Sequence, residues 1–464
     1  MKSTYRLASY AAMLTVALST AACQENEFGT VDLSGYKPDP ALTTDLTYNH
    51  PIALYTAADF ARVKAAIADG SISADAKKEF EVLQNNTYTT GDYGTTVHAH
   101  QQIVRGDAKG TIEGSENYAD AMRDAAAAYQ FGLLYQLTGN DDYAAKGIKI
   151  LNGWAQVCQE VTSNDANHYL AAGCQGFTFA LAAEELRSYS GWTESDFTLF
   201  KNWMTDVFAS KNYNFLMLHA NVTCGAKHYW SNWDLVNLCS YLQIGILTES
   251  DDMVKFVIEY FTSSGAGNGA LKNLICGDGH TDPLGSGETL YQNQESGRDQ
   301  GHACMSTAVA GQLCQAAWAL YQCNPSVTSL DFFSLNDNAV LKMAEFVAMT
   351  NLRQGTDNAN AEGSWLIEAS KIPWTTVGPW CTGSSNHAAS LSHESFADDS
   401  GRGTPRPGWE IFYNHYKQQG VSGYTYCQMY ADKLRPECGS GDSRYGNNSG
   451  AFDQIGWGTL MMYQ

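Results

Sequence analysis

Apolar side chains recur at helical spacings of three and four residues along most of the chain, and runs with strand-like alternation are scarce. This pattern predicts an all-α protein of about a dozen helices. Gly139 follows one of the longest runs, as a helix-ending glycine does. The predicted helices are Thr56–Ala68, Ala74–Gln84, Tyr118–Leu137, Tyr143–Val157, His168–Tyr189, Glu194–Phe208, Asn232–Leu247, Asp251–Phe261, Asp299–Tyr321, Asn338–Met349 and Trp409–Gln418.

These helices are of two kinds. Glu194–Phe208 and Asp251–Phe261 carry a charged face, as helices at a protein surface do. His168–Ala183, Leu235–Leu247 and Ala303–Leu320 are nearly uncharged on every side, which predicts that other helices bury them. Alternation of half-exposed and fully buried helices predicts a double ring, an incomplete α/α toroid.

Long segments rich in Gly, Ser, Asn, Trp and Tyr separate some of the helices: Thr87–Asn117, Gly265–Gly297 and Thr350–Pro407. Loops of this length in a compact domain are usually functional or disordered. Their aromatic content argues against disorder. Trp365, Trp374 and Trp380 lie in the last of these segments, and Tyr413 follows shortly after it. Aromatic loops over the mouth of a helical ring suit a sugar-binding cleft, so we expect the cleft there.

The N-terminus has the pattern of an export signal. Lys2 and Arg6 precede the apolar stretch Leu7–Leu18, and small residues then lead to Cys23. The apolar stretch is too short to span a bilayer. An ordinary signal peptide could carry a cysteine here, but Leu18 to Cys23 resembles the lipobox of bacterial lipoproteins, with Cys23 acylated. We therefore expect an outer-membrane lipoprotein that faces the periplasm or the cell surface.

The remaining chain is expected to form a single domain, because no linker or change of composition interrupts it. The predicted division is a signal peptide over 1–22, the lipidated Cys23 with a polar tether to 47, and one toroid domain over 48–464. We expect membrane attachment only through the lipid, and a monomer, although no sequence feature fixes the oligomeric state.

The chain is strongly acidic, with 28 basic and 49 acidic residues and a formal net charge of −21. This charge argues against a nucleic-acid partner, because a phosphate backbone requires a basic face. Net charge governs long-range steering, not a local site. Any site for an anionic ligand must therefore be built from a few placed cations and helix N-termini, which carry partial positive charge.

The chain has 12 cysteines. With Cys23 lipidated, an odd number is left, so at least one thiol is unpaired within the chain. No cysteine–histidine cluster has zinc-site spacing. Several cysteines lie in apolar helical runs, where they act as small buried side chains; examples are Cys239, Cys304 and Cys314. We expect no metal and no cofactor.

Two segments could carry chemistry. The first runs from His228 through Tyr229 and Trp230 to Ser231–Asp234, which has the capping-box pattern at the start of a buried helix. Asn232 is thereby predicted in the first turn of that helix. Asp234 is explained by capping alone, whereas capping requires neither a histidine nor an asparagine between two tryptophans.

The second segment is Gln294–His302, in which Ser296–Asp299 repeats the capping-box pattern before another buried helix. Arg298 is predicted in the first turn, and His302, four residues later, on the same face. A third buried helix begins near His168 and carries Gln175 further along. We weigh His168 equally as a cleft residue and as a packed one.

These side chains suit abstraction of a proton next to a carboxylate. In a 4-linked uronic acid the proton on C5 can be removed only if the developing enolate-like charge is stabilised. Asn232, Arg298 or a histidine could neutralise the carboxylate. A tyrosine or histidine would take the proton, and another donor would protonate the leaving O4. No metal is required for this reaction.

The same segments resemble the polysaccharide lyases of the alginate lyase superfamily, and most closely polysaccharide lyase family 38, whose members act on alginate and glucuronan. The resemblance covers the chain from about Ala171 to its end. The matching stretches are His228–Leu235, Gly265–Ala270, Gln294–His302, Arg406–Glu410 and Ser449–Gln454. It implies an α/α barrel and metal-free β-elimination that leaves an unsaturated uronate end on an anionic polysaccharide.

The chain departs from the superfamily at the reacting groups. Many members have Asn-Asn-His where this chain has Ser231-Asn232-Trp233, and a tyrosine soon after the arginine where this chain has His302. The phenol could therefore come from Tyr229 or Tyr291, and the base could be His228 or His302. The predicted catalytic residues are His228, Tyr229, Asn232, Arg298 and His302. The predicted substrate-binding residues are His168, Gln175, Trp233, Tyr291, Gln294, Glu295 and Arg406.

Two other functions fit parts of the pattern. A glycoside hydrolase on the same toroid would use two carboxylates, Glu295 with Asp234 or Asp299. A non-catalytic glycan-binding lipoprotein would use the aromatic loops, but it leaves the clustered Arg298 and histidines without a purpose.

Overall fold

The computed structural model describes residues 45–107, 110, 112, 116–222, 225–262, 267–354, 363–376, 394–397, 399, 401–446 and 449–462. Residues 39–464 form one compact unit. The predicted signal peptide, Cys23 and most of the predicted tether lie outside the described residues. The last tether residues are described, and hydrogen bonds to Asp251 fix them. The Leu46 N–H donates to Asp251 Oδ2 at 3.1 Å, and the hydroxyl of Tyr48, just after the tether, donates to Oδ1 at 2.8 Å.

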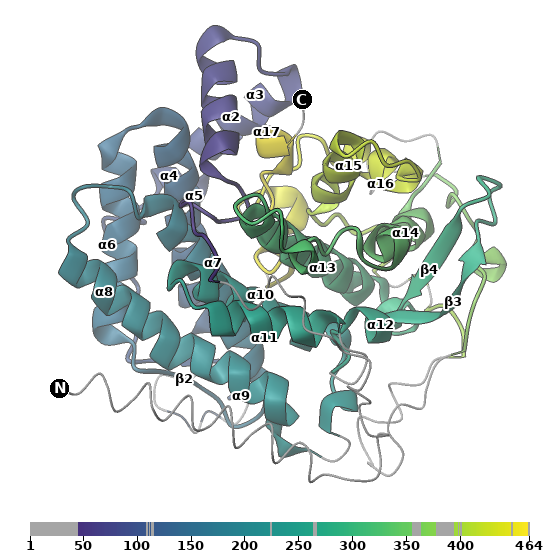
Figure 1. Cartoon of the computed structure of the whole chain (residues 1–464), viewed down its shortest axis with the longest axis horizontal. Helices are drawn as coiled ribbons and strands as arrows, with labels where there is room; N and C mark the ends of the chain where they lie inside the picture. The colour runs from purple at the N-terminus through teal and green to yellow at the C-terminus, as the bar shows by residue number, and fades with distance from the viewer. Residues whose placement is uncertain are drawn as a thin grey trace. The chain divides into compact units, whose positions relative to one another are not determined.

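The described residues are mostly helical (Figure 1). The helices are α2 (Ala57–Asp69), α3 (Ala74–Gln84), α4 (Thr87–Thr90), α5 (Tyr118–Thr138), α6 (Asp141–Val157), α7 (Asn167–Leu186), α8 (Glu194–Trp203), α9 (Ser210–Leu218), α10 (Ser231–Leu247), α11 (Asp251–Thr262), α12 (Leu271–Leu274), α13 (Gln300–Tyr321), α14 (Leu335–Asn351), α15 (Trp409–Gln418), α16 (Thr425–Leu434) and α17 (Gly458–Met462). Short 3-10 turns cover His219–Asn221, Gly225–Lys227, Gln294–Gly297, Thr328–Leu330, Ala369–Lys371, Ser443–Tyr445 and Ser449–Ala451.

The predicted helices are confirmed within a few residues, and Gly139 ends α5 in the left-handed conformation with φ of 71°. Glu194–Phe208 is the main difference, because α8 runs through a π-helical turn at Met204–Ala209 directly into α9. The sequence pattern did not predict α16, whose short amphipathic run follows a glycine-rich stretch.

The nearly uncharged helices are the inner ones, as predicted. α10 packs against α7, α13 and α11, and every residue of α10 except Trp233 is buried. A Cβ atom at Gly173 of α7 would lie 2.6 Å from the side chain of Val236 of α10. Glycine therefore lets the two inner helices approach closely, which alanine would prevent. The outer helix α11 buries one face only, including Val254 and Ile258.

The described strands are short and form two-stranded sheets. β1 (Gln102–Val104) pairs in parallel with β2 (Glu160–Thr162). β3 (Ile275–Thr281) pairs antiparallel with β4 (Thr289–Asn293), with an irregularity between Cys276 and His280. The expectation that Gly265–Gly297 is a long loop was therefore wrong. The hairpin was hidden because Gly277 and Gly279 interrupt its alternation.

The aromatic residues expected to line a sugar cleft pack against the protein where they are described. The guanidinium groups of Arg353 and Arg402 lie 3.7 Å and 4.1 Å from the centre of the Trp365 ring. Tyr413 is only 6% exposed, and Trp374 meets Phe396 edge-on at 6.2 Å. Trp380 lies outside the described residues. These contacts give Trp365 and Tyr413 a packing role rather than a sugar-stacking one.

All cysteines in the described ranges are free thiols, and all but Cys323 are buried. Cys239, Cys304 and Cys314 lie in helices α10 and α13, as expected of small buried side chains. Within the same ranges, no helix is both long and apolar enough to cross a membrane.

A buried carboxyl group near the start of α15 makes stability depend on pH. Glu437 is 1% exposed, and its Oε2 accepts hydrogen bonds from the backbone N–H groups of Trp409 at 2.8 Å and Glu410 at 3.1 Å. No described residue bonds its Oε1. Burial, with the nearby charge of Glu410, raises the pKa of Glu437 from 4.5 to about 8.

The folded state therefore keeps a proton on Glu437 that the unfolded chain releases above pH 4.5. The free energy of unfolding should fall as pH rises from there to about 8, by on the order of a few kcal/mol. Glu437→Gln keeps the accepting carbonyl and should lose this part of the slope, measured by denaturant unfolding across pH. Glu81→Gln, at an exposed position, is the control. Equal slopes in wild type and Glu437→Gln would contradict the expectation.

Candidate active site

Glu295 joins the two segments singled out in the sequence. It is fully buried in the 3-10 turn Gln294–Gly297, and its Oε1 accepts from Ser231 Oγ and Asn232 N, each at 2.9 Å. The Asn232 amide Nδ2 donates to both carboxylate oxygens, at 2.9 and 2.8 Å. A carboxylate at the N-terminus of a helix is favoured by the helix dipole. Glu295 therefore holds the first turn of α10.

The predicted capping box at Ser231–Asp234 was wrong. The N-cap of α10 is Trp230, without a side-chain cap, and the Ser231 hydroxyl points to Glu295. Asp234 is fully buried and accepts from Gly269 N and Tyr260 OH, both at 2.9 Å. The tertiary partner Glu295 thus replaces a local cap. Asn232 does lie in the first turn, as predicted.

The box predicted at Ser296–Asp299 was also wrong, because α13 begins at Gln300 and Asp299 is its N-cap. Asp299 Oδ1 accepts from His302 N at 2.8 Å, which is ordinary N-cap geometry. Ser296 belongs to the preceding turn. Arg298 consequently lies before the helix rather than in its first turn, but it still meets His302 through a shared partner.

That shared partner is the Asp299 carboxylate. His302 Nδ1 lies 2.6 Å from Asp299 Oδ2, and the Nε of Arg298 lies 3.7 Å from the same oxygen. Burial alone would raise the pKa of Asp299, but the hydrogen bonds from His302 and the positive charge of Arg298 outweigh it and lower the pKa. A carboxylate acceptor fixes the proton of His302 on Nδ1, which leaves Nε2 as an acceptor. The His302 side chain is 40% exposed.

Arg298 is held from two sides and stays accessible. Its Nη1 donates to Glu295 Oε2 at 3.1 Å, and its guanidinium lies 5.2 Å from the centre of the Trp230 ring. The side chain is 25% exposed. Charged partners fix the orientation of the planar group, so its remaining N–H donors can present a ready-made site for a carboxylate.

Aromatic rings surround Tyr229, just before the start of α10. Tyr229 lies 4.8 Å from Trp233, 4.9 Å from His228 and 5.1 Å from Phe215, between ring centres. Burial, and then the nearby Tyr169, raises the pKa of Tyr229 to about 12. The phenol therefore keeps its proton at neutral pH.

His168, at the start of α7, belongs to the same aromatic group. Its ring lies 4.0 Å from that of Tyr169, which in turn lies 5.3 Å from Phe215. His168 Nδ1 lies 2.8 Å from the carbonyl oxygen of Asp165. Burial, with the positive charge of Lys211, lowers the pKa of His168, which favours a neutral ring.

Arg406, in the C-terminal part of the chain, is held by backbone carbonyl groups. Its Nη1 donates to the carbonyl oxygens of Pro405 at 3.1 Å and Tyr445 at 3.4 Å. Burial raises the pKa of Asp453, and the positive charges of Arg105 and Arg406 oppose this rise. These two arginines therefore lie near one buried carboxyl group although the whole chain is acidic.

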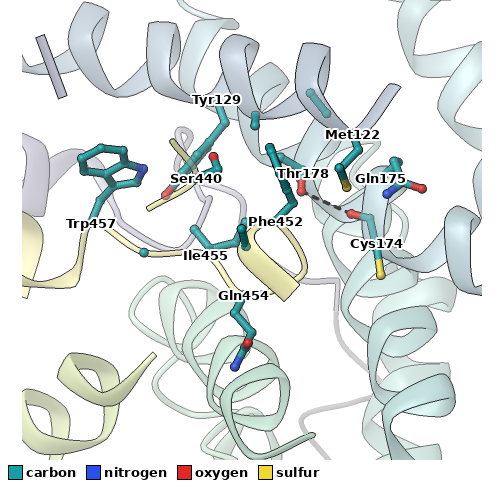
Figure 2. Close-up of a pocket in the computed structure, with 14 residues that line it drawn as sticks. Met122, Tyr129, Cys174, Gln175, Thr178, Ser440, Phe452, Gln454, Ile455 and Trp457 are labelled. Atoms are coloured by element: carbon teal, nitrogen blue, oxygen red, sulfur yellow. Dashed lines mark hydrogen bonds between the residues drawn. The ribbon is translucent and has the colours of Figure 1, made fainter. Parts of the chain in front are cut away.

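Three predicted substrate-binding residues lie elsewhere or are enclosed. Gln175 is 2% exposed and lines a small cavity of about 10 Å³ between α5, α7 and the segment Ala451–Trp457, roughly enough for one water (Figure 2). Gln294 is fully buried, accepting from Ser231 N at 2.9 Å and donating to the Asn273 carbonyl at 3.2 Å. Tyr291 lies on β4, and the Nζ of Lys342 lies 5.6 Å from the centre of the Tyr291 ring.

The assignments of Gln175, Gln294 and Glu295 are corrected accordingly. All are buried, and the contacts of Gln294 and Glu295 hold the protein together rather than face a ligand. Asn232 is 2% exposed and its amide nitrogen is taken by Glu295, so it too acts as a positioning residue. The residues that stay partly open around the two segments are His228, Trp233, Arg298, His302, His168 and Arg406.

Sequence reasoning missed Arg105 and the partners of Asp234, which are His219 and Tyr260. Arg105 follows β1 inside a stretch treated as a loop, so no pattern marked it. In the described ranges, no cluster of three or more His, Cys, Asp or Glu side chains could hold a metal ion.

Comparison with known proteins gives a family match over part of the chain and a shared fold. Residues 68–273 match the sequence model of the alginate lyase family. No curated protein matches the chain. Alginate lyase A1-III from Sphingomonas species A1 has a similar structure, with a TM-score of 0.55, 13% sequence identity, and coverage of 92% of this chain and 100% of that one.

Two variants of alginate lyase A1-III complexed with a tetrasaccharide are similar as well. The histidine-to-alanine variant gives a TM-score of 0.56 at 12% identity, and the tyrosine-to-phenylalanine variant 0.55 at 11%; each comparison covers 92% of this chain and 99% of that chain. The predicted all-α class and α/α toroid are confirmed by this likeness. The alginate lyase family model therefore matches one part of the chain, residues 68–273, and the solved structures share its α/α toroid fold.

Proposed function

We propose that this protein cleaves a 4-linked uronic-acid polysaccharide, with alginate the first candidate and glucuronan the second, by metal-independent β-elimination. One observation carries the proposal. Arg298 is fixed between Glu295 and Asp299 yet remains 25% exposed, beside His302. A partly exposed guanidinium next to a histidine with a bare ring nitrogen can bind a carboxylate and remove the neighbouring proton.

Arg298 neutralises the substrate carboxylate in this proposal. Loss of the C5 proton moves negative charge onto the carboxylate, and a preoriented cation stabilises that charge more in the transition state than in the bound substrate. Asn232 contributes indirectly, since its amide fixes Glu295 and Glu295 fixes Arg298.

We assign His302 as the base and Tyr229, which is 6% exposed, as the acid. His302 presents Nε2 because Nδ1 is bound to Asp299. Tyr229, with a pKa of about 12, holds a proton that it can give to the leaving oxygen. His228 is the second candidate for the base because it contacts Tyr229. Tyr291 is less suited, since its ring faces the ammonium group of Lys342 on α14.

The reaction is balanced without a further reactant. Nε2 takes the proton from C5, the electron pair forms the double bond between C4 and C5, and the C4–O4 bond breaks. The phenol proton of Tyr229 goes to O4, so the products are a new chain end and an unsaturated uronate. Proton return from His302 to Tyr229 through solvent restores the enzyme.

The hydrolase alternative is less well supported. Both oxygens of Glu295 accept hydrogen bonds from Ser231, Asn232 or Arg298, and the residue is fully buried. A general acid must present a proton to the glycosidic oxygen, whereas both oxygens of Glu295 act as acceptors for neighbouring groups.

Placement within polysaccharide lyase family 38 is part of the proposal, and it rests on the segments His228–Leu235 and Gln294–His302. The tetrasaccharide complexes of alginate lyase A1-III support an oligouronate as ligand of the shared fold. We further propose export and lipid anchoring at Cys23, which membrane fractionation of the wild type and of Cys23→Ser would test.

The test is an ultraviolet assay of the purified chain on polymannuronate, polyguluronate, glucuronan and a neutral glucan, with chelator present. The expected result is a rise in absorbance from the C4–C5 double bond on a uronate polymer alone. New reducing ends without absorbance would indicate a hydrolase. Retained binding without either signal would indicate a glycan-binding protein.

A further inference from the structure

A buried polar network lies behind Tyr229, outside the groups assigned to the reaction. Asp234, fully buried in α10, accepts from Tyr260 OH at 2.9 Å, and its Oδ1 lies 3.1 Å from His219 Nε2. The Tyr260 hydroxyl lies 3.3 Å from the same His219 nitrogen. His219 is 2% exposed and has a left-handed backbone with φ of 43°, an uncommon conformation for a residue with a side chain.

The network holds a glycine-rich segment against α10. Gly269 N donates to Asp234 Oδ2 at 2.9 Å, and Gly267 N donates to Tyr260 OH at 3.0 Å. A Cβ atom at Gly267 would collide with Asp234 and Tyr260, and one at Gly269 would collide with Asp234. Only glycine lets the backbone approach the carboxylate this closely. The segment is therefore fixed by its backbone.

The residue between these glycines points toward the proposed acid. Asn268 is 2% exposed, and its Nδ2 donates to the carbonyl oxygen of Tyr229 at 2.7 Å. The Tyr229 ring is packed by Phe215, whose ring also contacts His219 at 5.1 Å. The network thus contacts Tyr229 in two ways: Asn268 bonds the Tyr229 backbone, and Phe215, which contacts His219, packs against the Tyr229 ring.

The same segment also reaches the Arg298 side of the site. Asn273 donates to the carbonyl oxygen of Gly267 at 2.9 Å, and the Asn273 carbonyl accepts from Gln294 at 3.2 Å. Gln294 precedes Glu295, which holds Arg298. One glycine-rich segment therefore connects the supports of the proposed acid with those of the proposed carboxylate site.

We propose that Asn268, fixed by Asp234 and Tyr260, is a positioning residue that sets Tyr229 for proton donation to the leaving oxygen. This inference rests on the proposed function, because it assigns Asn268 a part in the same reaction. Its effect passes through Tyr229 and not through contact with the substrate. A displacement of about 1 Å of a catalytic group can cost on the order of 100-fold in rate.

A double-mutant cycle tests the proposal. Asn268→Ala should lower kcat by about 10- to 100-fold with little change in KM. In a Tyr229→Phe background, the same substitution should change kcat by less than about 2-fold, since the group that it positions has been removed. A merely structural role would instead give additive losses in the two backgrounds.

Asn324→Ala is the matched control. Asn324 is also buried, and its Nδ2 donates to the carbonyl oxygen of Thr47 at 2.9 Å, far along the chain from Tyr229. It should leave kcat and KM unchanged. If Asn268→Ala does not fold, as judged by thermal melting, Tyr260→Phe enters the same cycle. It removes only the hydroxyl that fixes Gly267 and should also depend on Tyr229.

The outcomes separate this inference from the proposed function. An inactive wild type removes the proposed function and the inference with it. An active wild type with additive losses in the cycle overturns the positioning role alone. An active wild type whose kcat is unaffected by Tyr229→Phe also overturns it, because Asn268 would then have no acid to position.

Discussion

Replacement of Arg298 by alanine should lower kcat/KM on a uronate polymer by on the order of 1,000-fold, since removal of a preoriented charge-stabilising donor typically costs 100- to 1,000-fold. The guanidinium is the partly exposed cation that Glu295 and Asp299 orient. Its loss removes the charge that stabilises the enolate-like transition state. The measurement is the initial rate of ultraviolet absorbance against substrate concentration.

Folding should survive the change, because Glu295 keeps hydrogen bonds from Ser231 and Asn232. Arg298→Lys should recover only part of the rate, since an ammonium cannot reproduce the planar fork. Arg62→Ala is the matched control: Arg62 also pairs with a carboxylate three residues earlier, Asp59 at 3.3 Å, but on α2. Full activity of Arg298→Ala would rule out this residue as the carboxylate site.

The parts of the fold that depend on burial were predictable from the sequence. The scarcity of charge along His168–Ala183, Leu235–Leu247 and Ala303–Leu320 identified the inner helices, because burying an unpaired charge is costly. The left-handed Gly139 at the end of α5 was predictable for a local reason as well. The sequence pattern predicts helix burial and helix ends because both depend on residues within a few positions of one another.

Long-range partners were not predictable, and most of the site depends on them. Ser231–Asp234 has the local pattern of a capping box, yet Glu295, 64 residues away from Ser231, replaces the local cap. Asp234 is drawn instead to Gly269 and Tyr260, which lie on other segments. Sequence spacing describes the nearest few residues only, so a tertiary contact can override it without any local sign.

The glycine-rich stretch offers an instructive intermediate case. Its resemblance to a family motif marked it, but no chemistry could be assigned, because glycine has no side chain. The structure supplies the reason: Gly267 and Gly269 leave room for Asp234. Residues 263–266, just before it, lie outside the described ranges. The sequence therefore showed the glycines but not the carboxylate for which they leave room.

The net charge was also less informative than the local arrangement. A formal charge of −21 suggests a poor partner for a polyanion. However, Arg105 and Arg406 lie near the carboxyl group of Asp453, and the guanidinium of Arg298 lies beside Asp299. These cations are close enough to oppose long-range repulsion at the site, where field strength depends on the nearest charges.

Replacement of His302 by alanine should lower kcat by about 100- to 10,000-fold, the range expected for loss of a general base. Binding should weaken much less, because Arg298 keeps its partner Glu295. Asp299→Asn should give a smaller loss. Asparagine still caps α13 but removes the charge that orients the His302 ring at 2.6 Å.

Added imidazole provides the most discriminating measurement. The His302 side chain is 40% exposed, so the space left by alanine is open to solvent, and imidazole should restore part of kcat in His302→Ala. It should not restore Arg298→Ala, which lacks a cation rather than a base. His100→Ala is the matched control, because His100 is also 40% exposed and lies 2.8 Å from an aspartate, Asp120. Loss of activity in His302→Ala without any rescue, together with rescue of His228→Ala, would transfer the role of base to His228.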